Sequence, residues 1–259
     1  MIMLKSPREI DLLREAGVIV AETLELMREH AVPGVSTAEL DRIAEDHIRS
    51  RGAEPAFKGY RVPGIRDAYP ASICASVNEE VVHGIPSDRK LCEGDILSVD
   101  VGTCKNKYFG DAAITIAIGN VSEEARKLLE ATEGALMAAI AVIRPDMPLS
   151  EISRAVQQYA EGRGYSVVRK FVGHGIGRQM HEEPQVPNFV GPGGPANDVR
   201  LAIGTVIAIE PMVNLGSENV EVQSNGWTVK TKDSRLSAHF EHSVAVTQDG
   251  PRILTALDN

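Results

Sequence analysis

The sequence repeats its own order of helix and strand signals at a spacing of 112 residues. Pro145 follows Pro33 by 112 residues, and Gly164 follows Gly52 by the same distance. Three more pairs share this spacing: Leu40 and Ile152, Arg42 and Arg154, and Arg51 and Arg163. A period this long exceeds that of solenoid repeats and favours a duplicated supersecondary unit. The sequence therefore predicts a single domain over residues 1–259, made of two similar halves at about 5–118 and 119–250.

A second register supports the duplication. The segment 91–100, Leu-Cys-Glu-Gly-Asp-Ile-Leu-Ser-Val-Asp, resembles the segment 201–210, Leu-Ala-Ile-Gly-Thr-Val-Ile-Ala-Ile-Glu, at an offset of 110 residues. Both segments end an apolar strand pattern with a carboxylate, Asp100 in one and Glu210 in the other. We expect a functional site to lie between the halves, where these carboxylates meet.

Each half opens with two predicted helices. Ser6-Pro7-Arg8-Glu9 is typical of a capping box with proline at the first helical position, and Ser36-Thr-Ala-Glu39 predicts a second helix to about Arg51. In the second half, Ser122 caps a predicted helix to about residue 143, and Pro148 or Leu149 leads another to about residue 163. The order of these signals predicts two helix pairs.

Short β-branched runs predict the strands that complete each half. They cover residues 72–82, 96–101, 112–118, 167–172, 205–210, 227–231 and 243–247. Two helices and a sheet segment per half indicate the α+β class, with an internally duplicated antiparallel sheet.

Charge and hydropathy narrow the functional class. The formal net charge is −9, so the chain lacks the basic footprint with which proteins neutralise nucleic-acid phosphates. No apolar run approaches the ~18 residues that a membrane span needs, and the N-terminal residues do not resemble a signal peptide. Cys74, Cys92 and Cys104 form no CxxC pair and are expected to be free thiols. These features predict a cytoplasmic protein with no direct nucleic-acid or membrane partner.

Two aspartates flank a short polar stretch between apolar strand patterns. If the turn lies near Lys105-Asn106, a hairpin places Asp100 directly opposite Asp111, with Cβ atoms ~5 Å apart. Two opposed carboxylates in a poorly solvated site repel each other, so one is protonated or a cation lies between them. Two metal ions that share bridging carboxylates occupy a space of about this width.

Glu210 and Glu241 repeat this arrangement in the second half. Glu210 ends an apolar strand pattern, and Glu241 begins one much as Asp111 does. A single strand aspartate is more often a hydrogen-bonded structural residue than a ligand. Four carboxylates in apolar strand contexts are difficult to explain as solvated surface.

Histidines complete the candidate cluster. His174 lies in Gly-His-Gly-Ile-Gly, His83 in a matching His-Gly-Ile sequence, and His181 seven residues after His174. One imidazole with four carboxylates suits manganese, iron(II), cobalt or zinc. The glycine-rich stretch lacks the Lys-Ser/Thr of a phosphate-binding loop. The neighbouring Glu182 and Glu183 are expected to be a solvated pair.

These motifs together resemble those of type I methionine aminopeptidases, metallopeptidases with the pita-bread fold. The resemblance covers about residues 2–254 and includes His83-Gly-Ile-Pro, Asp100-Val-Gly, Gly-Asp111-Ala, Gly-His174-Gly-Ile-Gly, Met-His181-Glu-Glu-Pro, Glu210-Pro-Met, Trp227-Thr-Val-Lys-Thr-Lys-Asp and Phe-Glu241-His-Ser. It implies an enzyme that removes the N-terminal methionine of peptides and nascent chains, at the ribosome in some cases, with preference for a small second residue. The family expectation is a monomer.

The resemblance also implies roles for individual residues. Asp100, Asp111, His174, Glu210 and Glu241 would bind two divalent metal ions, with Asp111 and Glu241 bridging. A hydroxide activated by both metals would attack the first peptide bond while Glu210 moves its proton. His181 would stabilise the oxyanion, and His83 would contact the scissile amide nitrogen. The implied methionine pocket contains Tyr60, Tyr69, Cys74 and Trp227.

Three departures from the family pattern concern the pocket. Met180 stands where many bacterial relatives have Phe, His239 where many have Gln, and residues 61–68 form a longer loop than usual. Two alternatives remain at this point. Proline-directed aminopeptidases and prolidases keep the five ligands but usually add an N-terminal domain, for which the first helix at Pro7 leaves no room. A non-catalytic peptide-binding module of the same fold would have lost ligands.

Overall fold

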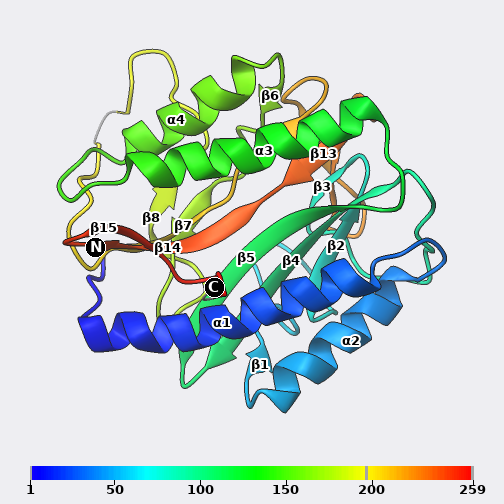
Figure 1. Cartoon of the computed structure of the whole chain (residues 1–259), viewed down its shortest axis with the longest axis horizontal. Helices are drawn as coiled ribbons and strands as arrows, with labels where there is room; N and C mark the ends of the chain where they lie inside the picture. The colour runs from blue at the N-terminus through cyan, green and yellow to red at the C-terminus, as the bar shows by residue number, and fades with distance from the viewer. Residues whose placement is uncertain (1, 196–197, 258–259) are drawn as a thin grey trace.

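Two pairs of helices cover a curved antiparallel sheet. The computed structural model describes residues 2–195 and 198–257. The helices in these ranges are α1 (Pro7–His30), α2 (Thr37–Ser50), α3 (Glu123–Val142) and α4 (Ser150–Glu161). Figure 1 shows α1 beside α2 and α3 beside α4, with β5 and β14 running between the two pairs. The predicted α+β class with a duplicated sheet and two helix pairs is confirmed.

Local capping explains where the helices begin and end. Ser6 accepts a hydrogen bond from the backbone of Glu9, whose side chain accepts one from the Ser6 backbone, so the predicted capping box is present. Ser36 also accepts from the third residue of its helix. After α2 and α4 the chain turns at Gly52 and Gly164, where φ is 66° and 85°. Glycine adopts this left-handed conformation without the steric penalty of a side chain.

All strand pairs of the structure are antiparallel. The large sheet has nine strands in the order β1-β4-β5-β14-β9-β7-β8, with β2 beside β4 and β15 beside β14, and two three-stranded sheets have the orders β13-β10-β6 and β11-β12-β3. The bounds are β1 Glu54–Pro55, β2 Ile73–Val77, β3 Glu80–Val82, β4 Ile96–Lys105, β5 Tyr108–Ala117, β6 Ser166–Val167, β7 Gly173–Gly175, β8 Glu182–Val186, β9 Val206–Ile209, β10 Met212–Asn214, β11 Val220–Val222, β12 Val229–Thr231, β13 Ser237–His239, β14 Glu241–Thr247 and β15 Gly250–Ile253.

The sequence predicted no strand at β1, β7, β8, β10, β11, β13 or β15, and two of the predicted runs differ from the strands that form. The run 72–82 is interrupted at Asn78, where φ is 59°, so it forms β2 and β3 in different sheets. The run 167–172 keeps only its first residue in a strand, β6. β-branched composition predicts extended backbone, but pairing depends on tertiary neighbours that the local sequence does not reveal.

The predicted register of the β4–β5 hairpin is wrong by two residues. Asp111 lies opposite Gly102 and Asp100 opposite Ala113, so the two aspartates are diagonal neighbours. The turn residues are Asn106 and Lys107, with φ of 52° and 66°, one position later than expected. Two successive residues with positive φ are typical of a type I′ turn, which fixes this register. A shift of two residues keeps both aspartates on one face of the sheet.

Side-chain alternation separates a helix-facing core from a second face. Leu97, Val99 and Val101 of β4 pack with apolar residues of α1 and α2 in one hydrophobic cluster. The residues between them, Ser98 and Asp100, lie on the opposite face, because successive strand side chains alternate. In β14, Val244 and Val246 join the cluster that includes α3 and α4. The sheet thus presents a polar-lined face that the helices do not cover.

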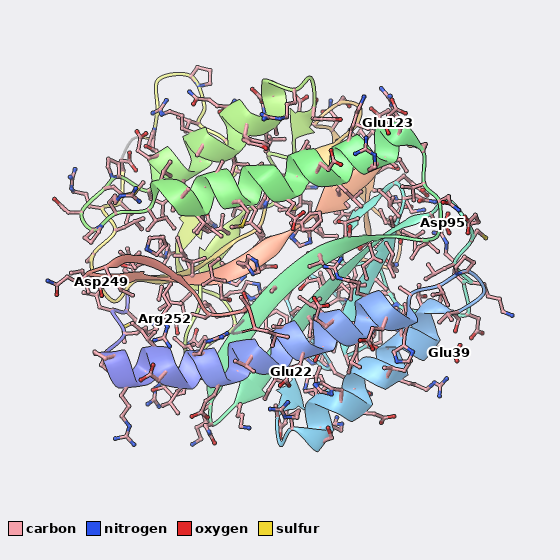
Figure 2. All side chains as sticks on the ribbon, viewed as in Figure 1. Glu22, Glu39, Asp95, Glu123, Asp249 and Arg252 are labelled. Atoms are coloured by element: carbon pink, nitrogen blue, oxygen red, sulfur yellow. The ribbon has the colours of Figure 1, made fainter. Side chains whose placement is uncertain are left out.

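The two halves share local conformation where the sequence aligns them. Gly94 and Gly204, which the offset of 110 pairs, both have φ of 92°. The division into halves near residue 118 stays a prediction. Within the described ranges, no helix is long and apolar enough to cross a membrane. Figure 2 places the exposed carboxylates Glu39, Glu123 and Asp249 toward the edges of the view.

Candidate active site

One pocket on the open face of the sheet brings together every residue that the sequence nominates for the site. Its cavity has a volume of about 130 Å³. The lining comprises Tyr60, Tyr69, Cys74, His83, Asp100, Asp111, His174, His181, Glu210, Trp227 and Glu241, together with Phe57 and Val62. The residues come from both halves of the chain. The predicted position of the site between the halves agrees with this lining.

Adjacent strands hold the four carboxylates. Asp100 lies on β4 and Asp111 on β5, while Glu241 begins β14 opposite Ala113 of β5. Glu210 follows β9 directly, and β9 pairs with β14. A hydroxyl bridge fixes β5 against β14, because Ser243 Oγ donates to the backbone oxygen of Asp111 at 2.8 Å. The hydrogen-bonded sheet thus positions these side chains before any ligand binds.

His174 presents one ring nitrogen to the carboxylates. Its Nδ1 donates to the backbone oxygen of Gly175 at 2.9 Å, which leaves the lone pair on Nε2. Nε2 lies 3.5 Å from Asp111 Oδ2 and 3.7 Å from Glu210 Oε1. Burial lowers the pKa of His174, so the ring is neutral near pH 7. A neutral imidazole whose other nitrogen is hydrogen-bonded is the usual form of a histidine metal ligand.

Burial raises the pKa values of all four carboxylates, and repulsion between them adds to the rise for Asp111, Glu210 and Glu241. Burial raises the pKa of Asp100 to about 7. Burial first, and then the charges of Asp100 and Glu210, hold the pKa of Asp111 well above its ordinary value. Burial and the neighbouring carboxylates likewise raise the pKa values of Glu210 and Glu241. A cluster of this kind tolerates full ionisation only when positive charge lies beside it.

The structure supplies no cationic side chain for this purpose within the described ranges. The only ion-pair partners of the four carboxylates there are His174 and His239. Three buried oxygens have no hydrogen-bond partner: Asp100 Oδ1, Asp111 Oδ1 and Glu241 Oε1. Ligand atoms of Asp111, His174 and Glu241 all lie within 4.8 Å of one another. Unpartnered oxygens and a free imidazole nitrogen around one point fit divalent metal ions.

Two further histidines face the cluster without belonging to it. His181 Nδ1 lies 2.7 Å from Tyr60 Oη, and its ring centroid is 4.2 Å from that of His174. His83 has φ of 59° and packs edge-on against Trp227. Burial lowers the pKa of each to about 4, helped by a neighbouring histidine in both cases. Both rings are therefore neutral near pH 7 and available for hydrogen bonds.

An aromatic and sulfur-lined recess adjoins the cluster. Cys74 of β2 pairs directly with Asp100 of β4, so the thiol lies on the same face as the carboxylate. Tyr69 contacts Trp227 edge to face, with ring centroids 5.2 Å apart. The indole nitrogen of Trp227 donates to the backbone oxygen of Asp67 at 3.1 Å. The longer loop 61–68 therefore supports the wall of the recess.

Four further residues border the site, of which the sequence analysis names only Met180 and His239, as departures from the family pattern. Phe57 and Val62 line the pocket, but nothing in their local sequence marks them. His239 Nε2 is buried without a hydrogen-bond partner, 4.0 Å from Glu210 Oε2 and 3.9 Å from Glu241 Oε2. The sequence analysis identifies His239 only as a departure from the family pattern at the pocket and predicts no contact with these carboxylates. Met180 is 3% exposed and packs close to Gly102 of β4, where a Cβ atom would lie 3.0 Å from Met180 Cε.

The expectation that Glu182 and Glu183 form a solvated pair is wrong for Glu182. The side chain of Glu182 is 12% exposed and pairs with Lys5 at 2.6 Å. Glu183 is exposed as expected. The two residues begin β8, where successive side chains take opposite faces, so Glu182 points to Lys5 while Glu183 points to solvent.

Comparison with known proteins gives consistent results. The model of metallopeptidase family M24 matches residues 11–248. A methionine aminopeptidase from Clostridium perfringens is 51% identical over 257 residues, covering 99% of this chain and 100% of that protein. A crystal structure of methionine aminopeptidase from Rickettsia prowazekii matches with a TM-score of 0.93 and 38% identity. The match covers 98% of this chain and 100% of that one. A prolidase from Pyrococcus furiosus, 22% identical with a TM-score of 0.74 over 66% of its length, shares the fold.

Proposed function

The chain belongs to metallopeptidase family M24, and on this basis we propose that it removes the N-terminal methionine from peptides and nascent chains. One observation carries the proposal. A metal-type cluster of acids and an imidazole opens directly into an aromatic and sulfur-lined recess, so both the reaction and the side-chain preference have a physical basis.

The cluster would hold two divalent ions, drawn from cobalt, manganese, iron(II) and zinc. Asp111, His174 and Glu241 supply the tightest group of ligand atoms, and Asp100 and Glu210 add carboxylates from either side. Bound divalent ions would polarise the scissile carbonyl and lower the pKa of water to generate the nucleophile. The unpartnered oxygens of Asp100, Asp111 and Glu241 support this assignment.

The protein's own side chains would then move protons and hold the substrate. Glu210 has a pKa raised by burial, which suits a group that takes a proton from the nucleophile and passes it on. Neutral His181 would donate a hydrogen bond to the oxygen that becomes negative, and neutral His83 would contact the scissile amide. A preorganised hydrogen-bond donor stabilises a developing charge because its dipole is already oriented toward the charge.

The recess would accept the methionine side chain. Tyr69, Cys74 and Trp227 offer an apolar surface with aromatic rings and a sulfur atom, which interact well with a thioether. Tyr60 would form the rim that lies nearest His181. The confined cavity would leave room for one side chain and favour a small second residue.

The test is metal-dependent release of methionine from a Met-Ala-Ser peptide. We expect the chelated protein to be inactive and added manganese, cobalt, iron(II) or zinc to restore release. An X-Pro peptide, measured in parallel, should be cut at least ~100-fold more slowly. Failure of the protein to cut either peptide with any of these metals would overturn the proposal, and faster cleavage of the X-Pro peptide would replace it with the prolyl alternative.

A further inference from the structure

A buried ion pair joins the start of the described chain to the loop that carries His181. We call residues 2–5 the N-terminal arm and residues 176–181, which connect β7 to β8, the His181 loop. Lys5 Nζ lies 2.6 Å from Glu182 Oε2, and the two side chains are 6% and 12% exposed. Lys5 Nζ also donates to the backbone oxygen of Met3 at 2.7 Å. Removing one partner of such a pair leaves the other charge buried and uncompensated.

Glu182 uses its second oxygen to organise the His181 loop. Oε1 accepts hydrogen bonds from the backbone nitrogens of Arg178 at 2.9 Å and Gln179 at 3.2 Å. Gly177 leaves no space, because a Cβ atom there would lie 2.4 Å from Lys5 Cε and 2.5 Å from Glu182 Oε1. The loop, the lysine and the glutamate therefore pack as one unit.

The main chain fixes Lys5 to the body of the sheet. The backbone nitrogen of Lys5 donates to the oxygen of Gly204 at 2.7 Å, and the nitrogen of Gly204 donates to the oxygen of Val246 in β14 at 2.9 Å. A Cβ atom at Gly204 would lie 2.6 Å from the Lys5 oxygen, so the arm and this turn are in close contact. The ammonium group consequently occupies a position set by the sheet that holds the carboxylates.

His181 is the loop residue next to Glu182, and the orientation of its ring is set by a hydrogen bond to Tyr60. Nδ1 of His181 lies 2.7 Å from Tyr60 Oη, a residue of a different loop. A small shift of the His181 backbone would lengthen this hydrogen bond and turn the ring relative to His174. The geometry of the ring is therefore linked to the ion pair through a single peptide unit.

We infer that the Lys5–Glu182 ion pair positions His181 for the reaction, although neither residue of the pair lines the pocket. The inference rests on the role proposed for His181 above. Lys5 and Glu182 are positioning residues: they act by holding the loop, and the chemistry belongs to His181. The chain thus uses a residue 176 positions away in sequence to set one side chain of the site.

The first test compares Lys5→Met with the parent in steady-state kinetics on Met-Ala-Ser. We expect kcat to fall by about 10- to 100-fold, because a displacement of about 1 Å of an aligned group can lower the rate by about 100-fold. KM and the manganese affinity measured by calorimetry should stay within about twofold. Lys5→Arg keeps the charge and should recover part of the lost kcat. A loss of metal affinity equal to the loss of kcat would overturn the inference.

A double-mutant cycle separates positioning from general destabilisation. In a His181→Ala background, Lys5→Met should lower kcat by less than twofold, because the group that it positions is gone. The Lys5→Met effect persisting at full size in that background would overturn the inference. Two controls accompany the cycle. Arg200→Met, which removes the exposed pair with Asp146, should keep parental kcat, and Val156→Ala, which opens the distant core, should lower stability without lowering kcat.

Amide hydrogen exchange tests the loop independently of activity. Exchange of residues 176–183 should accelerate by at least ~10-fold in Lys5→Met and in Glu182→Gln, and it should be unchanged in Arg200→Met. Unchanged exchange in the two pair variants overturns the inference even if the protein is an aminopeptidase. Accelerated exchange in a protein that cuts no peptide would refute the proposed function and leave the ion pair's control of the loop standing.

Discussion

At the residue scale, burial determines which hydrogen bonds the site histidines make. Burial and the charge of Asp111 raise the pKa of Tyr60, so its phenol stays protonated. A protonated phenol that donates to His181 Nδ1 leaves the ring proton on Nε2. His181 is thereby prepared as a hydrogen-bond donor through Nε2, whereas His174 is prepared as an acceptor on its Nε2. Two neighbouring imidazoles thus take opposite roles through their hydrogen-bond partners.

Substitutions at Glu210 and His83 should separate metal binding from turnover. Glu210→Ala removes a carboxylate from the cluster, so we expect lost activity and a metal content well below that of the parent. His83→Ala removes a pocket imidazole that has no ligand position, so kcat should fall by about 100-fold while most of the metal remains. Metal analysis after gel filtration, with kinetics on the same samples, measures both effects. Equal metal loss in the two variants would contradict the assignment of ligands.

At the scale of elements, the β4–β5 hairpin fixes the relation between Asp100 and Asp111. Its two-residue turn uses Asn106 and Lys107, both with positive φ. Asparagine tolerates this conformation, but lysine does so at a steric penalty, because its Cβ approaches the carbonyl oxygen. The turn therefore stores strain at one residue in order to hold the register of the site.

Lys107→Gly should raise the free energy of unfolding by about 1 kcal/mol, because glycine relieves the left-handed strain. Lys105→Gly, at the paired position just before the turn, should lower it, because glycine weakens a strand. Urea unfolding of the three proteins measures the difference. A destabilised Lys107→Gly variant would show that the turn is not strained.

The glycines that end α2 and α4 allow a parallel test in the two halves. A Cβ atom at Gly52 or Gly164 meets nothing within 4 Å, so substitution tests the backbone alone. Gly52→Ala and Gly164→Ala should each lower the free energy of unfolding by about 1 kcal/mol. Asparagine, which adopts this conformation more readily, should have a smaller effect at either position. Thermal or urea unfolding that shows an effect in only one half would contradict the equivalence of the two turns.

Features encoded locally were predictable from the sequence, and features that depend on long-range contacts were not. The serine caps at residues 6, 36 and 122 predicted three helix starts, because capping needs only neighbouring residues. The hairpin register was missed because apolar alternation is the same after a shift of two residues. Lys5 and Glu182 are 177 residues apart in sequence, and no local sequence pattern predicts such a contact.

The site residues followed the same rule. Carboxylates in apolar strands were recognisable because burial of an acid is unusual in itself. Phe57 and Val62 reach the site through loop packing, so their sequence context alone did not mark them. His239 was recognised as a departure from the family pattern at the pocket, but its approach to Glu210 and Glu241 depends on strand packing. Glu182 was misjudged because its buried partner lies at the other end of the chain.

At the scale of the whole molecule, clustered acids make the stability of the metal-free protein depend on pH. The pKa of Asp100 is raised from 3.8 to about 7, so the folded protein retains a proton that the unfolded chain releases. The free energy of unfolding therefore falls as the pH rises between these values. His83 and His181 act in the opposite sense, because their pKa values are lowered from 6.5 to about 4 and stability falls as the pH drops through that range.

Bound metal should remove the loss of stability that the metal-free protein shows as the pH rises and the carboxylates ionise. We expect the midpoint of thermal unfolding to fall between pH 6 and pH 8 in chelated protein and to change little in manganese-loaded protein. At 100 times the dissociation constant a ligand adds about 2.7 kcal/mol, which for a chain of this size is roughly 5 to 10 °C. Scanning calorimetry at each pH measures the difference in unfolding midpoint between the manganese-loaded and the chelated protein. If the difference in unfolding midpoint between manganese-loaded and chelated protein became smaller as the pH rises, this would contradict a carboxylate-rich cation site.

The small size of the pocket restricts which protein substrates can enter it. The pocket, with a volume of about 130 Å³, has room for a chain end only, so the following residues would run outward without secondary structure of their own. A substrate protein whose first residues are already packed into its own fold has no free N-terminus to enter the pocket. Removal of the first residue would therefore compete with folding of the substrate, and we expect proteins whose N-terminal segment becomes buried to be processed only while they are unfolded.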